Sequence, residues 1–382
     1  YQYFISIKLG GLGKMTKQLE TGIYNVRNVG RYIFQENALD FLPQILESRP
    51  DINIGPAIFI VDEFFQQDTD LVGRLPIRDV DRIFFVPTKD EPTTEYINAL
   101  YSKVVNAGRK NIKAVVGIGG GTTLDTAKAV SNLLGNGGRA EDYQGWDLLT
   151  KPGVYKVGVP TISGTGAEAT RTCVMTSKKT GLKLGMNSDF SLYDQLLLDP
   201  TLTKTVPGEQ YFFTGMDAYI HCTESLAGSY RNSIGDALSE KSLKLCQDVF
   251  MSDDMMTEEC RAKLMVASYL GGCAIATSYV GIVHPFSAGL SVVLGLHHGV
   301  ANCIALNGLK DFYGAAQEEL IAMTEKQNVV IPQSVCSGLG GEDLDRLYDA
   351  TIIHEKPLIN ALGPDFRDIL TRDRVTKLFS QM

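Results

Sequence analysis

In the first half of the chain, short apolar runs alternate with segments of helical spacing. Continuous apolar runs at 56–61 (PAIFIV), 82–86 (RIFFV) and 112–118 (IKAVVGI) have the length and composition of buried strands. The segment 92–109 has helical spacing, with a proline start signal and a glycine near its end. Strands that alternate with helices predict parallel βαβ units, and therefore a Rossmann-like, doubly wound parallel sheet.

Strand-like runs cease after about residue 195, and helical patterns follow. Glycine and proline fall mostly between or at the ends of five helical segments, 214–229, 234–252, 257–279, 284–296 and 299–312. This change predicts an α/β domain over residues 1–195 and an all-helical domain over residues 196–382. No low-complexity linker separates them, so we expect direct packing with the active site in the cleft between the domains. The tail from about residue 330 carries no chemical signal.

A glycine-rich turn joins the third predicted strand to the next helix, and reads GGGTT over residues 119–123. Its glycines allow a sharp turn and close approach to a ligand, and Thr122 or Thr123 can cap the helix. Free N–H groups at a positive helix end favour a pyrophosphate. The pattern differs from the usual dinucleotide fingerprint, because the third glycine position after Gly117 and Gly119 is Thr122. A plain tight turn is the alternative.

Two further features fit a dinucleotide. Asp62 ends the first clear strand, where a carboxylate can accept hydrogen bonds from a ribose, and its charge would favour NAD over NADP. The segment 157–170 (VGVPTISGTGAEAT) is a strand followed by a turn of small and hydroxyl residues, which suits a backbone that approaches a flat ring or a diphosphate. The alternatives are a solvated strand-end carboxylate and a polar turn that opens a helix.

Four of the five histidines lie between residues 221 and 298. Asp217 and His221 are four residues apart in a run of good helix formers, so both side chains project from one helical face. His284 and His298 could close the same site from across a core. One carboxylate and up to three imidazoles suit Zn²⁺ or Fe²⁺, with an open position for water or substrate. The alternative is that each histidine is an ordinary core or surface residue, as we expect for His354.

These segments resemble the iron-containing (group III) alcohol dehydrogenases. The runs 215–224 (GMDAYIHCTE) and 298–302 (HGVAN) are similar to the metal-binding segments of that family. The run 119–128 (GGGTTLDTAK) is similar to its GGGSxxDxAK signature, and 160–170 (PTISGTGAEAT) to its PTTxGTGSEVT segment. The resemblance spans roughly residues 50 to 310.

The resemblance implies a set of site residues. The metal ligands would be Asp217, His221, His284 and His298. Together with Asp62, the cofactor contacts would be Gly119, Gly120, Gly121, Thr122, Asp125, Thr161, Ser163, Thr165 and Lys183. Lys183 stands where the family has a lysine near the nicotinamide and the metal, which makes it a candidate catalytic residue, and an exposed cation is the alternative. Many members carry a further histidine where this chain has Ala288, and His297 could replace it as a catalytic residue or simply support the site.

The implied reaction is oxidation of a primary alcohol to an aldehyde, or the reverse, with hydride transfer to NAD and a bound Fe²⁺ or Zn²⁺. Over its full length the chain looks most like the branch that oxidises the C8 hydroxyl of 3-deoxy-manno-octulosonate, which prepares an 8-amino sugar acid for lipopolysaccharide. That branch is also described as an oxidase that uses O₂. The polar set Arg171, Asn187, Lys204 and Tyr219, with Lys183, is compatible with an anionic sugar acid.

Three alternative functions stay open at this point. They are a dehydrogenase of small aliphatic alcohols, a sugar-phosphate cyclase similar to dehydroquinate synthase, and a non-catalytic nucleotide-binding protein. A cyclase would need a cluster of lysines and arginines for phosphate, and the bases are scattered. A binding-only protein would have no need of all four ligand positions.

Composition sets the remaining limits. A length of 382 residues suggests two domains, and 44% hydrophobic with 21% charged residues fits a globular protein. The net charge of −8 argues against nucleic acid or an anionic membrane as partner. Seven scattered cysteines without a CxxC motif favour a reducing cytoplasm. The start lacks the features of a signal peptide, and the absence of an initiating methionine leaves room for residues upstream. Family analogy suggests a homodimer.

Overall fold

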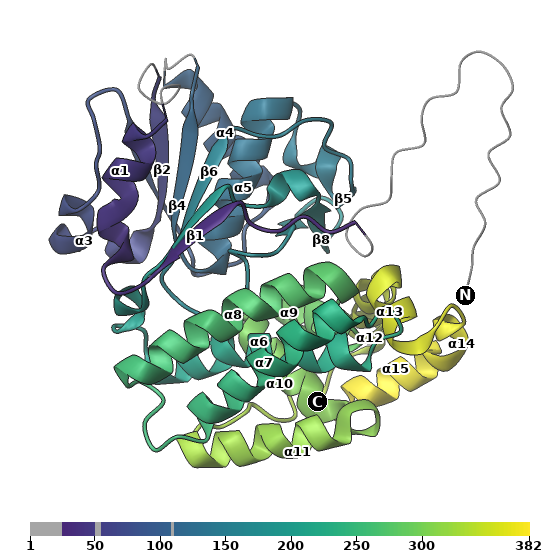
Figure 1. Ribbon diagram of the computed structural model, residues 1–382. Coiled ribbons are helices and arrows are strands. Elements are labelled where there is room, and N and C mark those ends of the chain that lie inside the picture. Colours follow the sequence, from purple (N-terminus) through teal and green to yellow (C-terminus); the bar gives the residue numbers. More distant parts are fainter. Residues whose placement is uncertain (1–24, 50–54, 108–110) are drawn as a thin grey trace, which may run out of the picture.

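The computed structural model of the chain describes residues 25–49, 55–107 and 111–382. A layered sheet region formed by the first half of the sequence rests on a bundle of helices formed by the second half (Figure 1). The parts of the predicted first domain at 1–24, 50–54 and 108–110 lie outside the described residues. So does the end of the predicted helix 92–109.

Six parallel strands form the main sheet, in the order β1-β9-β6-β4-β2-β3. The strands are β1 (Arg31–Phe34), β2 (Ala57–Asp62), β3 (Arg82–Val86), β4 (Ala114–Gly119), β6 (Tyr155–Pro160) and β9 (Gln195–Leu198). The predicted strands at 56–61, 82–86 and 112–118 are β2, β3 and β4, and the predicted parallel doubly wound sheet is confirmed. Both faces of β2 and β4 are buried, which explains why their sequences are continuously apolar.

Helices cover both faces of this sheet. Ile58, Ile60 and Val115 face α4 (Thr94–Asn106) and α5 (Gly121–Asn136). The alternate residues of the same strands pack against short elements on the other face. These are η1 (Ala38–Phe41), α1 (Leu42–Glu47), η2 (Glu63–Phe65) and α3 (Thr69–Gly73). The smaller elements η3 (Ala140–Tyr143), η4 (Asp189–Ser191) and η5 (Pro200–Thr203) lie in the connections.

A second, three-stranded sheet was not predicted from the pattern. Its strands are β5 (Gly145–Trp146), β8 (Leu182–Asn187) and β7 (Thr172–Ser177), in that order. Burial alternates along β7, so only one of its faces is apolar, and its mixed sequence gives no continuous hydrophobic run. β5 is only two residues long and depends on its pairing with β8.

The second half is helical, as predicted. Its elements are α6 (Gly208–Ala227), α7 (Ser233–Phe250), α8 (Glu258–Ser278), α9 (Val283–Leu294), α10 (His298–Gly308), α11 (Lys310–Gln327), α12 (Gly341–Ile352), α13 (Glu355–Leu362), α14 (Phe366–Ile369) and α15 (Arg372–Phe379). The five predicted helices correspond to α6 through α10. The end predicted at 312 was wrong, because α10 stops at Gly308 and α11 starts anew with a kink at Tyr313.

The described part of the chain contains no helix that by itself has the length and apolar composition to cross a membrane. Only α8 and α9 taken together meet those criteria, and they are bent by 108°.

The two halves pack directly against each other. After β6 the chain makes a loop in which Gly164 has φ 146°, and a Cβ atom there would lie 1.7 Å from the carbonyl oxygen of Thr214 in α6. Only glycine permits this approach of backbone to backbone. The domain boundary at residue 195 stays a prediction. The last strand of the sheet, β9, runs from Gln195 to Leu198.

A buried cation joins the two sheets. The Lys128 ammonium on α5 is fully buried and donates to the Asp125 carboxylate, to the Thr170 carbonyl and hydroxyl, and to the Thr172 carbonyl at the start of β7. The other oxygen of Asp125 accepts from the backbone N–H of Val174 in β7 at 2.9 Å. Burial raises the pKa of Asp125 despite the neighbouring ammonium. Lys128 and Asp125 therefore hold β7 against α5, the helix that follows the glycine-rich turn.

We expect Lys128→Ala to lower the free energy of unfolding by about 3–5 kcal/mol, because removing one partner leaves the Asp125 carboxylate buried without its counter-charge. Urea unfolding followed by circular dichroism measures the change. Lys326→Ala is the matched control, since Lys326 pairs with the exposed Asp253, and its unfolding midpoint should scarcely move. Equal effects of the two variants would contradict the role of Lys128 and Asp125 in holding β7 against α5.

Candidate functional site

A cavity of about 1410 Å³ lies between the sheet and the helical bundle. Asp62 at the end of β2, Gly120 after β4 and Thr161 after β6 line one side, at the carboxyl ends of parallel strands. Helices α6, α9 and α10 line the other side. Ligands bind at the carboxyl ends of strands in open parallel sheets, so this cavity is the candidate site.

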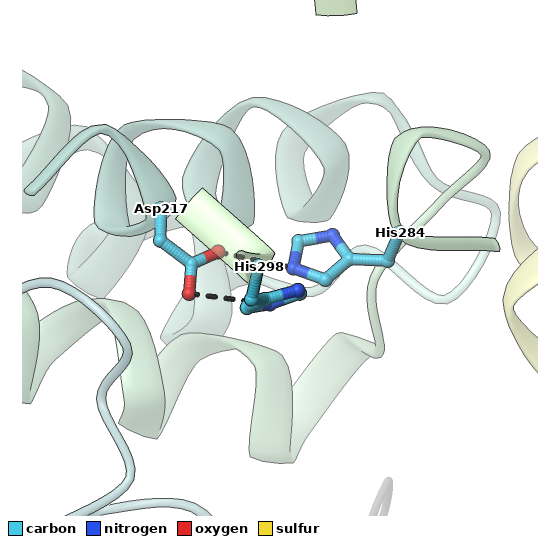
Figure 2. Close-up of side chains that lie close together, drawn as sticks. All are labelled: Asp217, His284 and His298. Carbon is cyan, nitrogen blue, oxygen red and sulfur yellow. Dashed lines mark hydrogen bonds and ion pairs between the residues drawn. The ribbon is translucent and has the colours of Figure 1, made fainter. Parts of the chain in front are cut away.

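Four predicted metal ligands converge at the helical side of the cavity. Ligand atoms of Asp217, His284 and His298 all lie within 4.8 Å of one another, and Figure 2 shows the two imidazoles grouped beside the carboxylate. Asp217 Oδ1 is 3.2 Å from His284 Nε2, and Oδ2 is 3.5 Å from His298 Nε2. His221 Nε2 lies 3.4 Å from Asp217 Oδ1, and its ring stacks on that of His284 at 4.7 Å.

Three helices place these side chains. Asp217 and His221 lie one turn apart on α6, as the spacing predicted. His284 stands in the first turn of α9, directly after the sharp bend from α8, and His298 is the first residue of α10. Gly299 allows that helix to approach α6, because a Cβ there would lie 2.5 Å from the Phe213 carbonyl oxygen.

Two supporting residues were not predicted. Glu224, on α6, contacts Nδ1 of His284 with one carboxylate oxygen and accepts the backbone N–H of Val283 with the other. Asn302 donates to Asp217 Oδ1 at 2.7 Å and lies 3.2 Å from His298 Nε2. Helical spacing could have found both, because Glu224 follows Asp217 by seven residues and Asn302 follows His298 by four. Carboxylates in this position fix the tautomer and orientation of a ligating histidine.

The charges in this group are strongly coupled. Burial lowers the pKa of His221 to about 4 and that of His298 to about 3. Burial also disfavours a charge on His284, but Glu224 and Asp217 outweigh it and raise the pKa of His284 to about 9. Burial opposes the charge on Asp217, and the neighbouring histidines still hold its pKa well below the usual range.

The residues fit a divalent cation. Asp217 Oδ2 and His221 Nδ1 are buried side-chain atoms without a hydrogen-bond partner. One carboxylate, two imidazoles that are neutral at pH 7 and a third that a metal can deprotonate form a suitable donor set for Fe²⁺ or Zn²⁺. The assignment of the four ligands stays a prediction.

Most of the predicted cofactor residues line the cavity. Those that do are Asp62, Gly120, Gly121, Thr122, Asp125, Thr161, Thr165 and Lys183. Gly119 and Ser163 are not part of the lining, and the Ser163 hydroxyl is buried without a hydrogen-bond partner. Asp62 accepts from the Phe64 N–H and the Thr88 hydroxyl, each at 3.0 Å.

The predicted capping of α5 by threonine was wrong. Gly120 is the residue that precedes the helix, and no side chain caps it. The Thr123 hydroxyl is instead buried without a partner, because the side chain packs under Gly119. The first N–H groups of α5 therefore receive no side-chain cap at the edge of the cavity, which suits a phosphate.

The two predicted catalytic residues differ in their surroundings. Lys183 is 8% exposed, with Nζ 2.6 Å from Glu91 Oε1 and 3.4 Å from His298 Nδ1, so the alternative of an exposed cation was wrong. Glu91 was not predicted, since only the tertiary structure brings it to Lys183. His297 is exposed at the cavity edge, and His354 from the tail also lines the cavity. The sequence did not predict that the tail contributes to the lining of the cavity.

We expect Glu224→Gln to lower the affinity for Zn²⁺ by about 10–100-fold, as is common when the carboxylate behind a ligating histidine is lost. Competition with a chromogenic chelator measures the affinity. Glu319→Gln is a matched control, because the Glu319 carboxylate accepts from Tyr219 and Gln247 rather than from a histidine. Unchanged zinc affinity in Glu224→Gln would refute the supporting role.

The affinity for Co²⁺ should rise with pH between 7 and about 9 and level off above, because the metal must displace a proton from His284, whose pKa is raised to about 9. The affinity for Co²⁺ should rise by at most about tenfold per pH unit, because one proton is displaced. The same proton stabilises the metal-free protein below pH 6.5, and that contribution is lost as pH rises through about 9. Chelator competition and urea unfolding across this range test both signs.

Comparisons with known proteins agree with this architecture. The family model described as iron-containing alcohol dehydrogenase matches residues 30–200, and the model described as Fe-containing alcohol dehydrogenase family, C-terminal, matches residues 212–330. Among solved structures, a 1,3-propanediol oxidoreductase has a TM-score of 0.80 at 20% identity, covering 94% of this chain and 99% of that one. A sulfoacetaldehyde reductase from Bifidobacterium kashiwanohense in complex with NAD⁺ has a TM-score of 0.78 at 19% identity, covering 94% and 98%. These likenesses show the fold.

Curated relatives are similar over shorter spans. The sulfoacetaldehyde reductase of Bilophila wadsworthia is 35% identical over 189 residues, 49% of each protein. The NAD-dependent methanol dehydrogenase of Bacillus methanolicus is 32% identical over 223 residues, 57% of this chain and 56% of that protein. The chain spans about half the length of the curated relatives it matches. With both family models matched in sequence order and the fold shared, the chain belongs to the iron-containing alcohol dehydrogenase family.

Proposed function

We propose that this chain is a metal-dependent oxidoreductase that interconverts a primary alcohol and an aldehyde with NAD. The observation that carries this proposal is one cavity with two faces. The uncapped start of α5 lies on one face, and the carboxylate and histidines around Asp217 lie on the other. A reaction between a nucleotide and a metal-bound substrate needs this juxtaposition. The membership in an alcohol dehydrogenase family supports it.

The nucleotide would lie along the carboxyl ends of the strands. The N–H groups of Gly121 and Thr122 at the start of α5 would receive the pyrophosphate. Asp62, already oriented by Phe64 and Thr88, would accept hydrogen bonds from the ribose, and its charge favours NAD over NADP. When bound, NAD supplies the acceptor for a hydride.

The metal would be held by Asp217, His221, His284 and His298. When bound, Fe²⁺ or Zn²⁺ supplies a Lewis acid for the substrate oxygen. Glu224 keeps the His284 ring in place through its Nδ1 atom. Lys183 is held by Glu91 beside His298, where its ammonium can orient the reacting oxygen or the nicotinamide. His297 would exchange protons with solvent at the cavity edge, because Ala288 supplies no ionisable side chain of its own.

For the substrate, we propose a primary alcohol with an anionic group, and first the C8 hydroxyl of 3-deoxy-manno-octulosonate. The basic residues Lys89, Lys356 and Arg367 line the cavity. Two residues expected to serve this role do not line it, since Lys204 is exposed elsewhere and Tyr219 is buried against Glu319. A sulfonate is the second candidate, because a relative 35% identical over its matched span is a sulfoacetaldehyde reductase.

Three further expectations stay predictions. They are the cytoplasm as location, a homodimer as assembly, and the choice between NAD and O₂ as final electron acceptor. All seven cysteines are buried and free, which is compatible with a reducing compartment. Arg171 does not favour the sugar-phosphate cyclase alternative, because its guanidinium pairs with Asp147 and Asp189.

We expect metal-loaded protein to oxidise 3-deoxy-manno-octulosonate and form NADH when NAD is supplied. The same oxidation should be far slower when NADP is supplied instead. NADH formation and O₂ consumption are followed side by side, with 2-hydroxyethanesulfonate and 1,3-propanediol as comparison substrates. His284→Ala should abolish turnover, and Asp62→Ser should reduce the preference for NAD over NADP by about 10-fold, the value of one lost charge-assisted hydrogen bond.

The outcomes separate the parts of the proposal. Loss of O₂ without net NADH would make the enzyme an oxidase. Turnover of 1,3-propanediol alone would remove the anionic substrate. No turnover of any alcohol or of the corresponding aldehydes, by protein that binds both metal and NAD, would refute the oxidoreductase.

A further inference from the structure

All five histidines of the chain line the same cavity. His221, His284 and His298 belong to the proposed metal group, and His297 is exposed at the cavity edge. The fifth, His354, comes from the connection between α12 and α13, far along the chain from the others. The fold therefore gathers every imidazole of this sequence around one space, and the role of His354 there needs an explanation.

The backbone holds His354 in one conformation. His354 has φ −81° and ψ 62°, and the N–H of Glu355 donates to the carbonyl of Ile353 at 2.9 Å. These are the angles and the hydrogen bond of an inverse γ-turn with His354 at its centre. The N–H of His354 donates to the Thr351 carbonyl at 3.3 Å, and its carbonyl accepts the Leu358 N–H at 3.1 Å. The turn therefore fixes the direction in which the imidazole leaves the backbone.

The helix before this turn packs closely on the helix that carries His284. A Cβ atom on Gly289, five residues after His284 in α9, would lie 3.0 Å from the Thr351 hydroxyl of α12. A side chain at that position would therefore crowd α12, and the glycine lets the two helices meet. Thr351 lies in the last turn of α12, three residues before His354. One helix, α9, thus places both a proposed metal ligand and the start of the turn at His354.

The helix after the turn is fastened to the bend that leads into α9. Asn360 on α13 donates to the carbonyls of Ser278 and Val280 at 2.9 and 3.0 Å. Ser278 is the last residue of α8, so these two bonds tie α13 to the connection between α8 and α9. Figure 1 shows α12 and α13, in yellow, at one end of the helical bundle. His354 is therefore held from both sides, by α12 and by α13.

The His354 imidazole is partly buried and lies within electrostatic reach of the metal group. Burial, together with the charges of Lys183 and His284, lowers the pKa of His354 to about 4. The ring is therefore neutral at pH 7, and one of its nitrogens has a lone pair that can accept a proton. Among the described residues, none makes a hydrogen bond with this ring. The lone pair thus stays available to a ligand of the cavity.

The position of His354 suits a general base. Three imidazoles of the lining are engaged with Asp217, and His297 is exposed to solvent. His354 is the imidazole of this lining that is partly buried and stands outside the metal group. Oxidation of an alcohol requires a group that accepts the hydroxyl proton, and a neutral imidazole fulfils that task most often in enzymes.

We propose that His354 is a catalytic residue whose imidazole contacts the hydroxyl of the bound alcohol and accepts its proton. The O–H bond breaks and the proton moves to the imidazole, while the C–H bond breaks and the hydride moves with its electron pair to NAD. A carbonyl forms and the aldehyde leaves. In the reverse direction, the His354 imidazolium returns the proton to the oxygen. The inference rests on the proposed function and names its general base. The rival is that His354 only shapes the turn between α12 and α13.

Two substitutions at one position separate proton transfer from structure. Full-length, metal-loaded protein oxidises 3-deoxy-manno-octulosonate, 2-hydroxyethanesulfonate or 1,3-propanediol with NAD. We expect His354→Gln to lower kcat about 100-fold or more, because glutamine keeps a hydrogen-bonding group but cannot accept the proton. Bound metal and the affinity for NAD should stay unchanged. Added imidazole should restore part of the turnover of His354→Ala, which has space for it, and none to His354→Gln. Glu342→Gln is the control, since Glu342 is exposed in α12 outside the cavity lining.

Chemical modification gives a readout that does not depend on turnover. Diethyl pyrocarbonate modifies accessible neutral imidazoles, and mass spectrometry of peptides locates the modified histidines. Metal-loaded protein is treated with NADH alone and with NADH plus each alcohol, a combination that cannot react. Modification of His354 should proceed with NADH alone and be largely lost when the alcohol that the enzyme oxidises is added, because that alcohol occupies the position next to the ring.

Three results would overturn the proposal while leaving the proposed function in place. They are full turnover by His354→Gln, modification of His354 that the alcohol does not slow, and a loss in His354→Ala that imidazole does not restore, which would assign His354 a structural role. A different result would overturn the proposed function and the proton transfer together. It is the absence of turnover with all three alcohols by wild-type protein that binds both metal and NAD.

Discussion

The arrangement of the helical domain depends on one buried carboxylate. Asp217 is 1% exposed, and a charge at that depth costs several kcal/mol unless its surroundings compensate for it. Here compensation comes from His284 and His298 on two other helices, from His221 one turn away and from the amide of Asn302. Three helices must therefore meet at one point with their small residues inward. The Asp217 carboxylate and the three imidazoles are also suitable ligands for a divalent cation. The stability of the fold and the proposed affinity for a metal are therefore linked through Asp217.

A second buried charge organises the sheet domain in a similar way. Lys128 collects the Asp125 carboxylate and three oxygens from the segment that leads into β7, and thereby sets the small sheet beside the glycine-rich turn. That sheet in turn carries Lys183, which Glu91 directs toward His298, and supports Trp146. Asp125 and Lys183, which the family resemblance assigned to the nucleotide, thus also form ion pairs that stabilise the fold. Buried ion pairs therefore contribute to the position of the small sheet at the cavity.

Membership in the iron-containing alcohol dehydrogenase family supports the proposed reaction class. Ala288 in α9 lines the cavity, and the tail returns to the same cavity with His354 and Lys356. The relatives named above act on substrates as different as methanol and sulfoacetaldehyde.

The sequence by itself determined whatever depends on local pattern. Continuous apolar runs identified β2, β3 and β4, the glycine-rich turn identified the start of α5, and the four-residue spacing placed Asp217 and His221 on one face of α6. Only the tertiary structure decided the pairing of β5 with β8, the contact of Glu91 with Lys183 and the meeting of Trp146 with Lys356. The physical reason is that periodicity reports which face of an element is buried. It carries no information on which distant element supplies the partner, and that choice follows from the packing of the whole chain.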